Sequence, residues 1–130
     1  MVDPSEQRID VVARNIEKIS ENEAKTVESL EEDKMRQYNH LIETVRTQLV
    51  IVQQHSPGLM INWNLGLPKI LQQKNVLIIP KCRELRDFYI KQVKTIENNY
   101  NKKKSQTENM YRQEINRENS MVDQVAEGRR

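Results

Sequence analysis

Two stretches of this chain, residues 5–56 and 81–127, contain neither glycine nor proline. These two residue types disfavour a helix interior most, by about 1 and 3 kcal/mol relative to alanine. Two long helices are therefore predicted, at about 4–55 and about 80–127. Asp3 as N-cap, Pro4 at the first helical position and Glu6 three residues after Asp3 are typical of a helix start. Pro57 and Gly58 are expected to end the first helix.

Both stretches carry apolar residues at steps of three or four, with a mean step close to 3.6, so each predicted helix has one apolar face and a nearly straight course. The first stripe is Ile9, Val12, Ile16, Ile19, Glu23, Val27, Leu30, Lys34, Tyr38, Leu41, Val45, Leu49 and Val52. The second stripe is Ile78, Cys82, Leu85, Tyr89, Val93, Ile96, Tyr100, Lys104, Thr107, Tyr111, Ile115, Glu118, Val122 and Val125. The second stripe is thin from residue 101 to 120, where the helix is expected to fray unless a partner covers it.

Charge is divided between the two halves of the chain. Residues 1–52 contain 7 basic and 11 acidic residues, and residues 68–130 contain 14 basic and 8 acidic residues. An acidic helix followed by a basic helix of similar length favours an antiparallel hairpin, although each surface ion pair contributes only about 0–1 kcal/mol. The predicted fold is all-α, a coiled-coil-like hairpin of two long amphipathic helices that forms a single helical domain over residues 1–130.

The connection between the helices, about 56–79, is unusual for a linker. Residues 53–67 carry no Lys, Arg, Asp or Glu, and six of the nine residues from Leu59 to Leu67 are large and apolar. A solvated linker would be polar, so this loop is expected to pack down and to be followed by a short helix from Lys69 to about Asn75. Trp63 fits two readings equally, a recognition residue for a partner or a plug that caps the helical bundle.

Several apolar residues lie off the two stripes, among them Met35, Ile51 and Phe88. One seam cannot bury all of them, and contiguous exposed apolar surface marks interaction sites. We expect a non-enzymatic interaction or scaffold subunit whose partner is a second copy or another helical protein. The pattern resembles small subunits of helical scaffold, tethering or adaptor complexes in architecture alone. The predicted partner interface is Val45, Leu49, Val52, Trp63, Ile78, Leu85, Phe88, Tyr89, Val93 and Ile96.

Catalytic chemistry finds little support in the sequence. His40 with Glu43 three residues on is typical of an exposed helix pair, and Cys82 lies on the apolar stripe, as a buried structural thiol would. There is no phosphate-binding glycine loop, dinucleotide fingerprint or HExxH metal motif. We therefore expect no enzyme activity, no cofactor and no metal site.

Nucleic-acid binding is the alternative. Lys102, Lys103 and Lys104 form a basic run beside Tyr100 and Tyr111, as phosphate contacts would require. Acidic residues interrupt the basic surface of the second helix, at Glu84, Asp87, Glu97 and Glu108, and they argue equally against membrane-surface binding. No run approaches the ~20 apolar residues of a membrane span. A single cysteine and no secretory signal favour an intracellular protein, cytoplasmic or nuclear.

Overall fold

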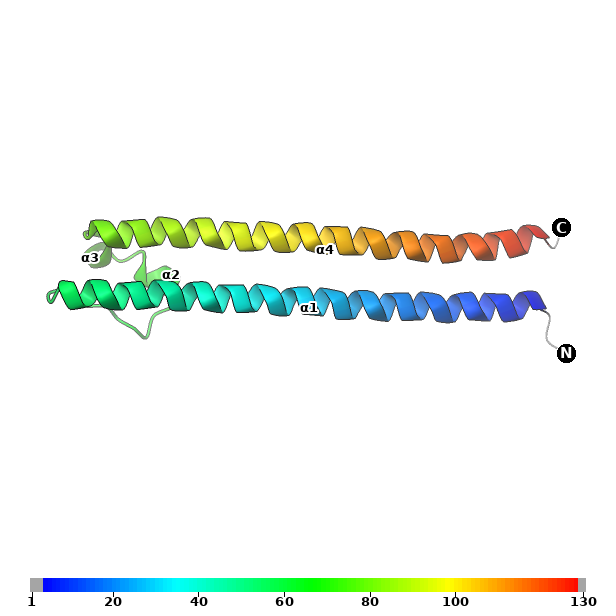
Figure 1. Ribbon diagram of the computed structural model, residues 1–130, viewed down its shortest axis with the longest axis horizontal. Coiled ribbons are helices and arrows are strands. Elements are labelled where there is room, and N and C mark those ends of the chain that lie inside the picture. The colour runs from blue at the N-terminus through cyan, green and yellow to red at the C-terminus, as the bar shows by residue number, and fades with distance from the viewer. Residues whose placement is uncertain (1–3, 129–130) are drawn as a thin grey trace. The chain divides into compact units, whose positions relative to one another are not determined.

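The computed structural model describes residues 4–128, and the surroundings of side chains from 6 to 121. The predicted N-cap Asp3 lies outside the described residues. The helices are α1 (Pro4–His55), α2 (Leu67–Ile70), α3 (Lys74–Leu77) and α4 (Pro80–Gly128). The described residues contain no strand, and α1 and α4 pack against each other as an all-α hairpin. This confirms the predicted fold class. Figure 1 shows α2 and α3 in the connection between the two long helices.

The chain divides into two compact units, and both long helices contribute to each. The first, here called the loop unit, is residues 33–99 and contains the connection with α2 and α3. The second, here called the terminal unit, pairs the first part of α1, up to Glu32, with the part of α4 from Tyr100 onward. The two units differ in how their helices are held together.

A dense aliphatic core fills the loop unit. On α1 the buried residues follow the predicted stripe, and both Val45 and Leu49 are 0% exposed. The uncharged loop packs down on them, as expected, with Leu59 and Ile61 buried. The core of this unit consists of Leu41, Val45, Leu49, Val52, Leu59, Ile61, Leu67, Ile70, Leu71, Val76, Cys82, Leu85 and Ile96. Burial of this kind contributes about 25 cal/mol per Å² of apolar surface.

The connection differs from the expected single short helix over 69–75. It forms two separate turns, α2 and α3, because Gln73 adopts an extended conformation (φ −71°, ψ 134°). In one continuous helix, the side chains of Ile70 and Val76 would point about 120° apart around the helix axis, on different faces. The break at Gln73 allows both side chains to reach 0% exposure. Burial of apolar residues thus overrides helix continuity here.

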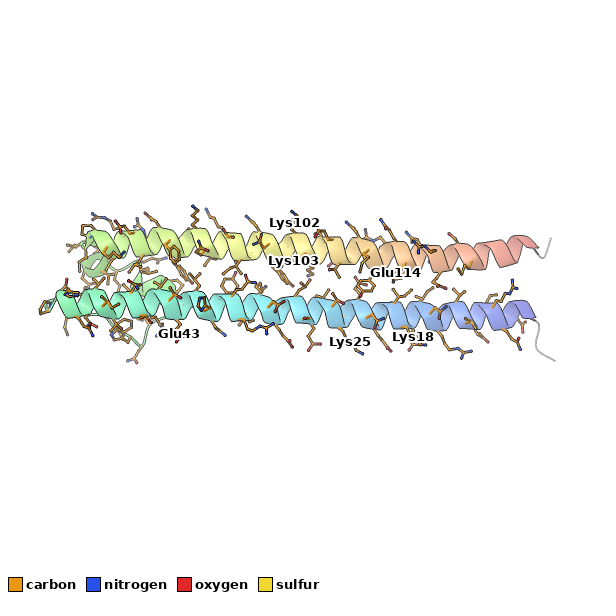
Figure 2. The ribbon with its side chains drawn as sticks, in the orientation of Figure 1. Lys18, Lys25, Glu43, Lys102, Lys103 and Glu114 are labelled. Atoms are coloured by element: carbon orange, nitrogen blue, oxygen red, sulfur yellow. The ribbon has the colours of Figure 1, made fainter. Side chains whose placement is uncertain are left out.

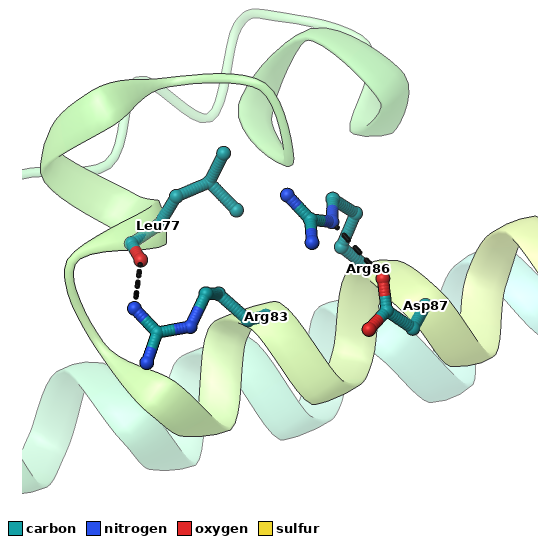
Figure 3. Close-up of polar contacts among 4 residues, drawn as sticks. All are labelled: Leu77, Arg83, Arg86 and Asp87. Carbon is teal, nitrogen blue, oxygen red and sulfur yellow. Dashed lines mark hydrogen bonds and ion pairs between the residues drawn. The ribbon is translucent and has the colours of Figure 1, made fainter.

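Side-chain donors hold the connection against the long helices. On α1, Gln53 Nε2 donates to the Leu59 carbonyl at 3.2 Å, and Arg46 Nη2 to the Leu65 carbonyl at 3.4 Å. On α4, Arg83 Nη1 donates to the Leu77 carbonyl at 3.1 Å, at the end of α3 (Figure 3). These bonds satisfy carbonyls that the irregular backbone leaves without helical partners.

The predicted second stripe starts too early. Ile78 precedes the first residue of α4, Pro80, so the helical step does not extend back to it, and its side chain is 73% exposed. Cys82, at 0% exposure, is the first residue of the stripe that lies in the core. Val122 and Val125, at the other end of the stripe, lie outside the residues whose side chains are described.

The terminal unit has a sparse, polar seam. Val12 is the one buried apolar side chain in its described part, and Ile16, Ile19 and Leu30 are half-buried. Hydrogen bonds join α1 to α4 across the seam. They are Asn15 Nδ2 to Glu118 Oε2 (3.4 Å), Thr26 Oγ1 with Tyr111 Oη (3.0 Å) and Tyr100 Oη to Glu31 Oε1 (3.2 Å). α4 is helical throughout residues 101–120.

Candidate interaction surfaces

Two long helices packed side by side leave a groove on each side of their seam, and in the loop unit the chain fills one of them. Arg46 and Gln53, seven residues apart, lie on one flank of the buried α1 stripe and bond the loop. Thr44 and Gln48, four residues apart, lie on the opposite flank, where the surface is hollowed. One groove is thus covered by the connection, and the other is open.

Two adjoining hollows make up this second groove, here called the open groove. The larger, of about 500 Å³, is lined by Arg36, Gln37, His40, Leu41, Thr44, Phe88, Gln92 and Ile96. The smaller, of about 350 Å³, is lined by Thr44, Val45, Gln48, Lys81, Glu84, Leu85 and Phe88. Thr44 and Phe88 line both hollows. The two hollows therefore form one continuous surface between α1 and α4.

The open groove is apolar along its floor and largely neutral along its edges. Core side chains such as Val45 and Leu85 form the floor, and Phe88 is 42% exposed at the centre. The α1 edge is mostly Gln, His and Thr, and at one end Lys81 pairs with Glu84 at 3.6 Å on α4. Ile51, one turn beyond Gln48, adds a further apolar side chain that is 41% exposed.

The ten residues of the predicted partner interface occupy three kinds of position. Tyr89, Val93 and Trp63 are half-buried against the core, whereas Phe88 and Ile78 are exposed. The other five lie inside the chain's own core, namely Val45, Leu49, Val52, Leu85 and Ile96. A partner can reach Phe88 from outside without opening the hairpin. The structure brings Phe88, Val45, Leu85 and Ile96 together at the open groove.

Sequence reasoning missed the polar edge of the open groove, which includes Gln37, Thr44, Gln48 and Gln92. A signal for the α1 edge was present. Gln37, Leu41, Thr44, Gln48 and Ile51 follow steps of three and four, a second stripe of uncharged residues beside the buried one. What the sequence did not indicate is which groove the connection would cover.

Cys82 and His40, the two side chains considered for chemistry, have different surroundings. Burial raises the pKa of the Cys82 thiol, which disfavours the reactive thiolate. His40 is exposed and lines the open groove. Glu43 is also exposed, on α1, and Figure 2 shows it on the side turned away from α4. The imidazole of His40 is therefore available as a contact in the open groove.

Two tyrosine hydroxyls bond carboxylates across the hairpin. In the loop unit, Tyr38 Oη donates to Glu97 Oε1 at 2.8 Å. Burial, and then this hydrogen bond to the carboxylate, raise the pKa of Tyr38 to about 12. In the terminal unit, burial and the bond to Glu31 raise the pKa of Tyr100. Both phenols are therefore held in the protonated, donating form.

The basic run of α4 is divided between surface and seam. Lys102 and Lys103 are exposed, and Figure 2 shows Lys102 on the side of α4 turned away from α1. Lys104 is half-buried, and its ammonium lies 5.9 Å from the centre of the Tyr100 ring. Lys104 therefore belongs to the seam, whereas Lys102 and Lys103 are available to a ligand.

Among the side chains that the structure describes, from residue 6 to 121, no three His, Cys, Asp or Glu gather as they would around a metal ion. In the same range, no helix combines the length and apolar character needed to cross a bilayer. No protein-family model matches the chain, and neither the curated proteins nor the solved structures contain a match.

Proposed function

We propose that this protein is a non-enzymatic interaction subunit that binds an amphipathic helix of another chain in its open groove. The observation that carries the proposal is Phe88. It is a large aromatic side chain, 42% exposed, above a floor of core aliphatic residues and between two hollows of about 500 and 350 Å³. Aromatic side chains in such central positions provide much of the binding energy of protein interfaces.

The other groove supports a helix as the occupant. There, the chain's own connection covers the seam with buried aliphatic residues from two short helices, Ile70 on α2 and Val76 on α3. The open groove has the same two long helices as its walls, and core residues such as Val45 and Leu85 form its floor. A helix with one aliphatic stripe would cover the floor and Phe88, as in other helix-in-groove complexes.

The edges of the groove define the flanks of that helix. Gln37, Thr44 and Gln48 are uncharged, so a partner helix would meet hydrogen-bonding groups beside its aliphatic stripe. Lys81 and Glu84 already pair with each other, and that pair offers no net charge. Recognition would therefore depend on shape and apolar contact more than on charge, and binding should change little with salt.

Matched substitutions on α4 test the proposal. Phe88→Gln removes the central apolar side chain, and Ile90→Gln removes one of similar exposure, 46%, that lines neither hollow. Sedimentation velocity at micromolar concentration tests a second copy as the partner, and affinity capture with each variant as bait tests another protein. Phe88→Gln should weaken assembly roughly 10- to 100-fold, as expected for a central aromatic residue, while Ile90→Gln should not.

Circular dichroism of each variant shows whether the hairpin remains folded. The proposal is supported by a dimer, or by a captured protein, that persists with Ile90→Gln and is lost with Phe88→Gln at equal helicity. A monomeric chain that captures no protein in a Phe88-dependent way contradicts it.

A further inference from the structure

One face of α4 in the terminal unit has no exposed carboxylate. The exposed residues of α4 between 101 and 121 are Asn101, Lys102, Lys103, Ser105, Gln106, Asn109, Met110, Arg112, Gln113, Asn116, Arg117, Asn119, Ser120 and Met121. This set, here called the acid-free face, contains four basic residues and six amides. Its side chains are almost all hydrogen-bond donors or cations.

The acidic residues of the same stretch are less exposed than the residues of this face. Glu108, Glu114 and Glu118 are half-buried. Glu118 accepts a hydrogen bond from Asn15 Nδ2 on α1 at 3.4 Å. Figure 2 shows Glu114 on the side of α4 that faces α1. Glu108, Glu114 and Glu118 are therefore less accessible to a ligand than Lys102, Lys103, Arg112 and Arg117.

Neighbouring surfaces do not share this property. In the terminal unit, the exposed residues of α1 include seven acids, Glu6, Asp10, Glu17, Glu21, Glu28, Glu31 and Glu32, against four bases, Arg8, Arg14, Lys18 and Lys25. In the loop unit, Glu84, Asp87 and Glu97 are exposed on α4 among its basic residues. Of the four acids that interrupt the basic surface in the sequence, Glu108 alone lies between residues 101 and 121, and it is half-buried.

We propose that the acid-free face binds the phosphodiester backbone of a nucleic acid. Lys102, Gln106, Asn109, Gln113 and Asn116 follow steps of four and three along the middle of the face. Lys103 and Arg117 flank this row on one side, and Arg112 flanks it on the other. Ammonium, guanidinium and amide groups all donate to phosphate oxygens and carry no sequence preference by themselves. At ~1.5 Å per residue the face is roughly 30 Å long, enough for several phosphates.

The composition of the face favours nucleic acid over an anionic membrane. A helix that binds a membrane surface buries an apolar stripe among the lipid chains. The acid-free face has Met110 and Met121 as its exposed apolar residues and no exposed aromatic residue. Its contacts would be polar and electrostatic, as those to a phosphate backbone are.

Two charge-matched variants of the full chain test this site. The first changes Lys102, Lys103, Arg112 and Arg117 to Gln, and the control changes Arg8, Arg14, Lys18 and Lys25 on α1 to Gln. Both remove four positive charges, so net charge is equal and only its place differs. Fluorescence anisotropy measures binding to a labelled 20-base-pair DNA and a 20-nucleotide RNA between 20 and 200 mM salt. With about four phosphate contacts, the affinity for duplex DNA should fall with a log–log salt slope near −3.6, roughly 150-fold between 50 and 200 mM.

The expected result is binding by the wild type and the α1 variant to at least one probe, with at least a tenfold loss in the α4 variant at unchanged helicity. Absence of binding at 20 mM salt, or equal loss in both variants, overturns the proposal. Flotation with phosphatidylserine vesicles and sedimentation velocity at low salt address other anionic partners. The proposal is also overturned if the α4 substitutions abolish vesicle binding or self-association and leave nucleic-acid affinity unchanged. Neither Phe88 nor the open groove is altered, so this result is independent of the helix-binding test.

Discussion

The loop unit and the terminal unit are built from the same two helices and the same repeating step, yet different interactions hold them together. In the loop unit thirteen buried residues form the core. In the terminal unit Val12 is the one apolar side chain in the described range that is similarly buried, and Asn15, Thr26 and Tyr100 make hydrogen bonds across the seam. Helical periodicity therefore predicts where the two helices meet, whereas the chemistry of the side chains decides how strongly the helices are held together.

Truncation of matched leucines should produce the largest contrast. Leu49→Ala in the loop unit removes a side chain that is 0% exposed and leaves a cavity, which typically costs about 2–5 kcal/mol. Leu30→Ala in the terminal unit removes a half-buried side chain and should cost about 1 kcal/mol. Urea denaturation followed by circular dichroism measures both. Equal losses for the two variants would mean that the terminal seam is packed as tightly as the core.

Trp63 gives the next largest effect, within the loop unit. Its side chain is half-buried against the core, so Trp63→Ala should lower the free energy of unfolding by about 1–2 kcal/mol, less than for a fully buried tryptophan. Met60→Ala is the control in the same loop, because Met60 is 77% exposed and should change stability by less than about 0.5 kcal/mol. Unchanged melting and unchanged partner affinity for Trp63→Ala would rule out both the plug and the recognition reading.

The smallest effect concerns the tyrosine hydroxyls and depends on pH. Tyr38→Phe removes the bond to Glu97 and should cost about 1 kcal/mol at pH 8. The pKa of Tyr38 is raised from 10.0 to about 12 in the folded chain, so between these values the unfolded chain loses the phenolic proton first. The contribution of Tyr38 is therefore complete below about pH 10 and declines as the pH rises toward 12.

Urea titrations of the wild type and Tyr38→Phe at pH 8 and pH 11 measure how the contribution of Tyr38 to stability changes with pH. The difference in unfolding free energy should shrink at the higher pH. A constant difference would mean that the phenol does not retain its proton through the contact with Glu97. Tyr111→Phe in the terminal unit, which removes the bond to the neutral hydroxyl of Thr26, should cost about 0.5 kcal/mol at pH 8.

Much of the fold could be predicted because it depends on local periodicity. Apart from Ile9 and Ile78, the stripe residues whose surroundings are described are buried or half-buried, including the polar members Glu23 and Lys34. The packing of the loop was predictable from its lack of charge. The start of the second stripe was misplaced at Ile78 because periodicity does not indicate where a helix begins. The predicted short helix is divided into α2 and α3 because residues on both sides of Gln73 are buried in the core. This burial is a tertiary effect.

The candidate surfaces were less predictable. Phe88 was identified as a partner residue because it is apolar and lies near the stripe. The open groove around it depends on which flank of the hairpin the connection covers, and both flanks carry uncharged residues. The acid-free face, by contrast, could have been found from sequence. On a helical projection, Glu108, Glu114 and Glu118 lie about 120° or more from Lys102, at the middle of the face.

The polar seam of the terminal unit also affects the register of α1 against α4. Aliphatic side chains at a 3.6-residue step fit almost as well after a shift of one turn, because apolar contact has little directionality. Hydrogen bonds from Tyr100 to Glu31 and between Tyr111 and Thr26 would be lost together in such a shift. The hydrogen-bonded seam therefore specifies one register of α1 against α4 within the terminal unit, as the bond from Tyr38 to Glu97 does in the loop unit.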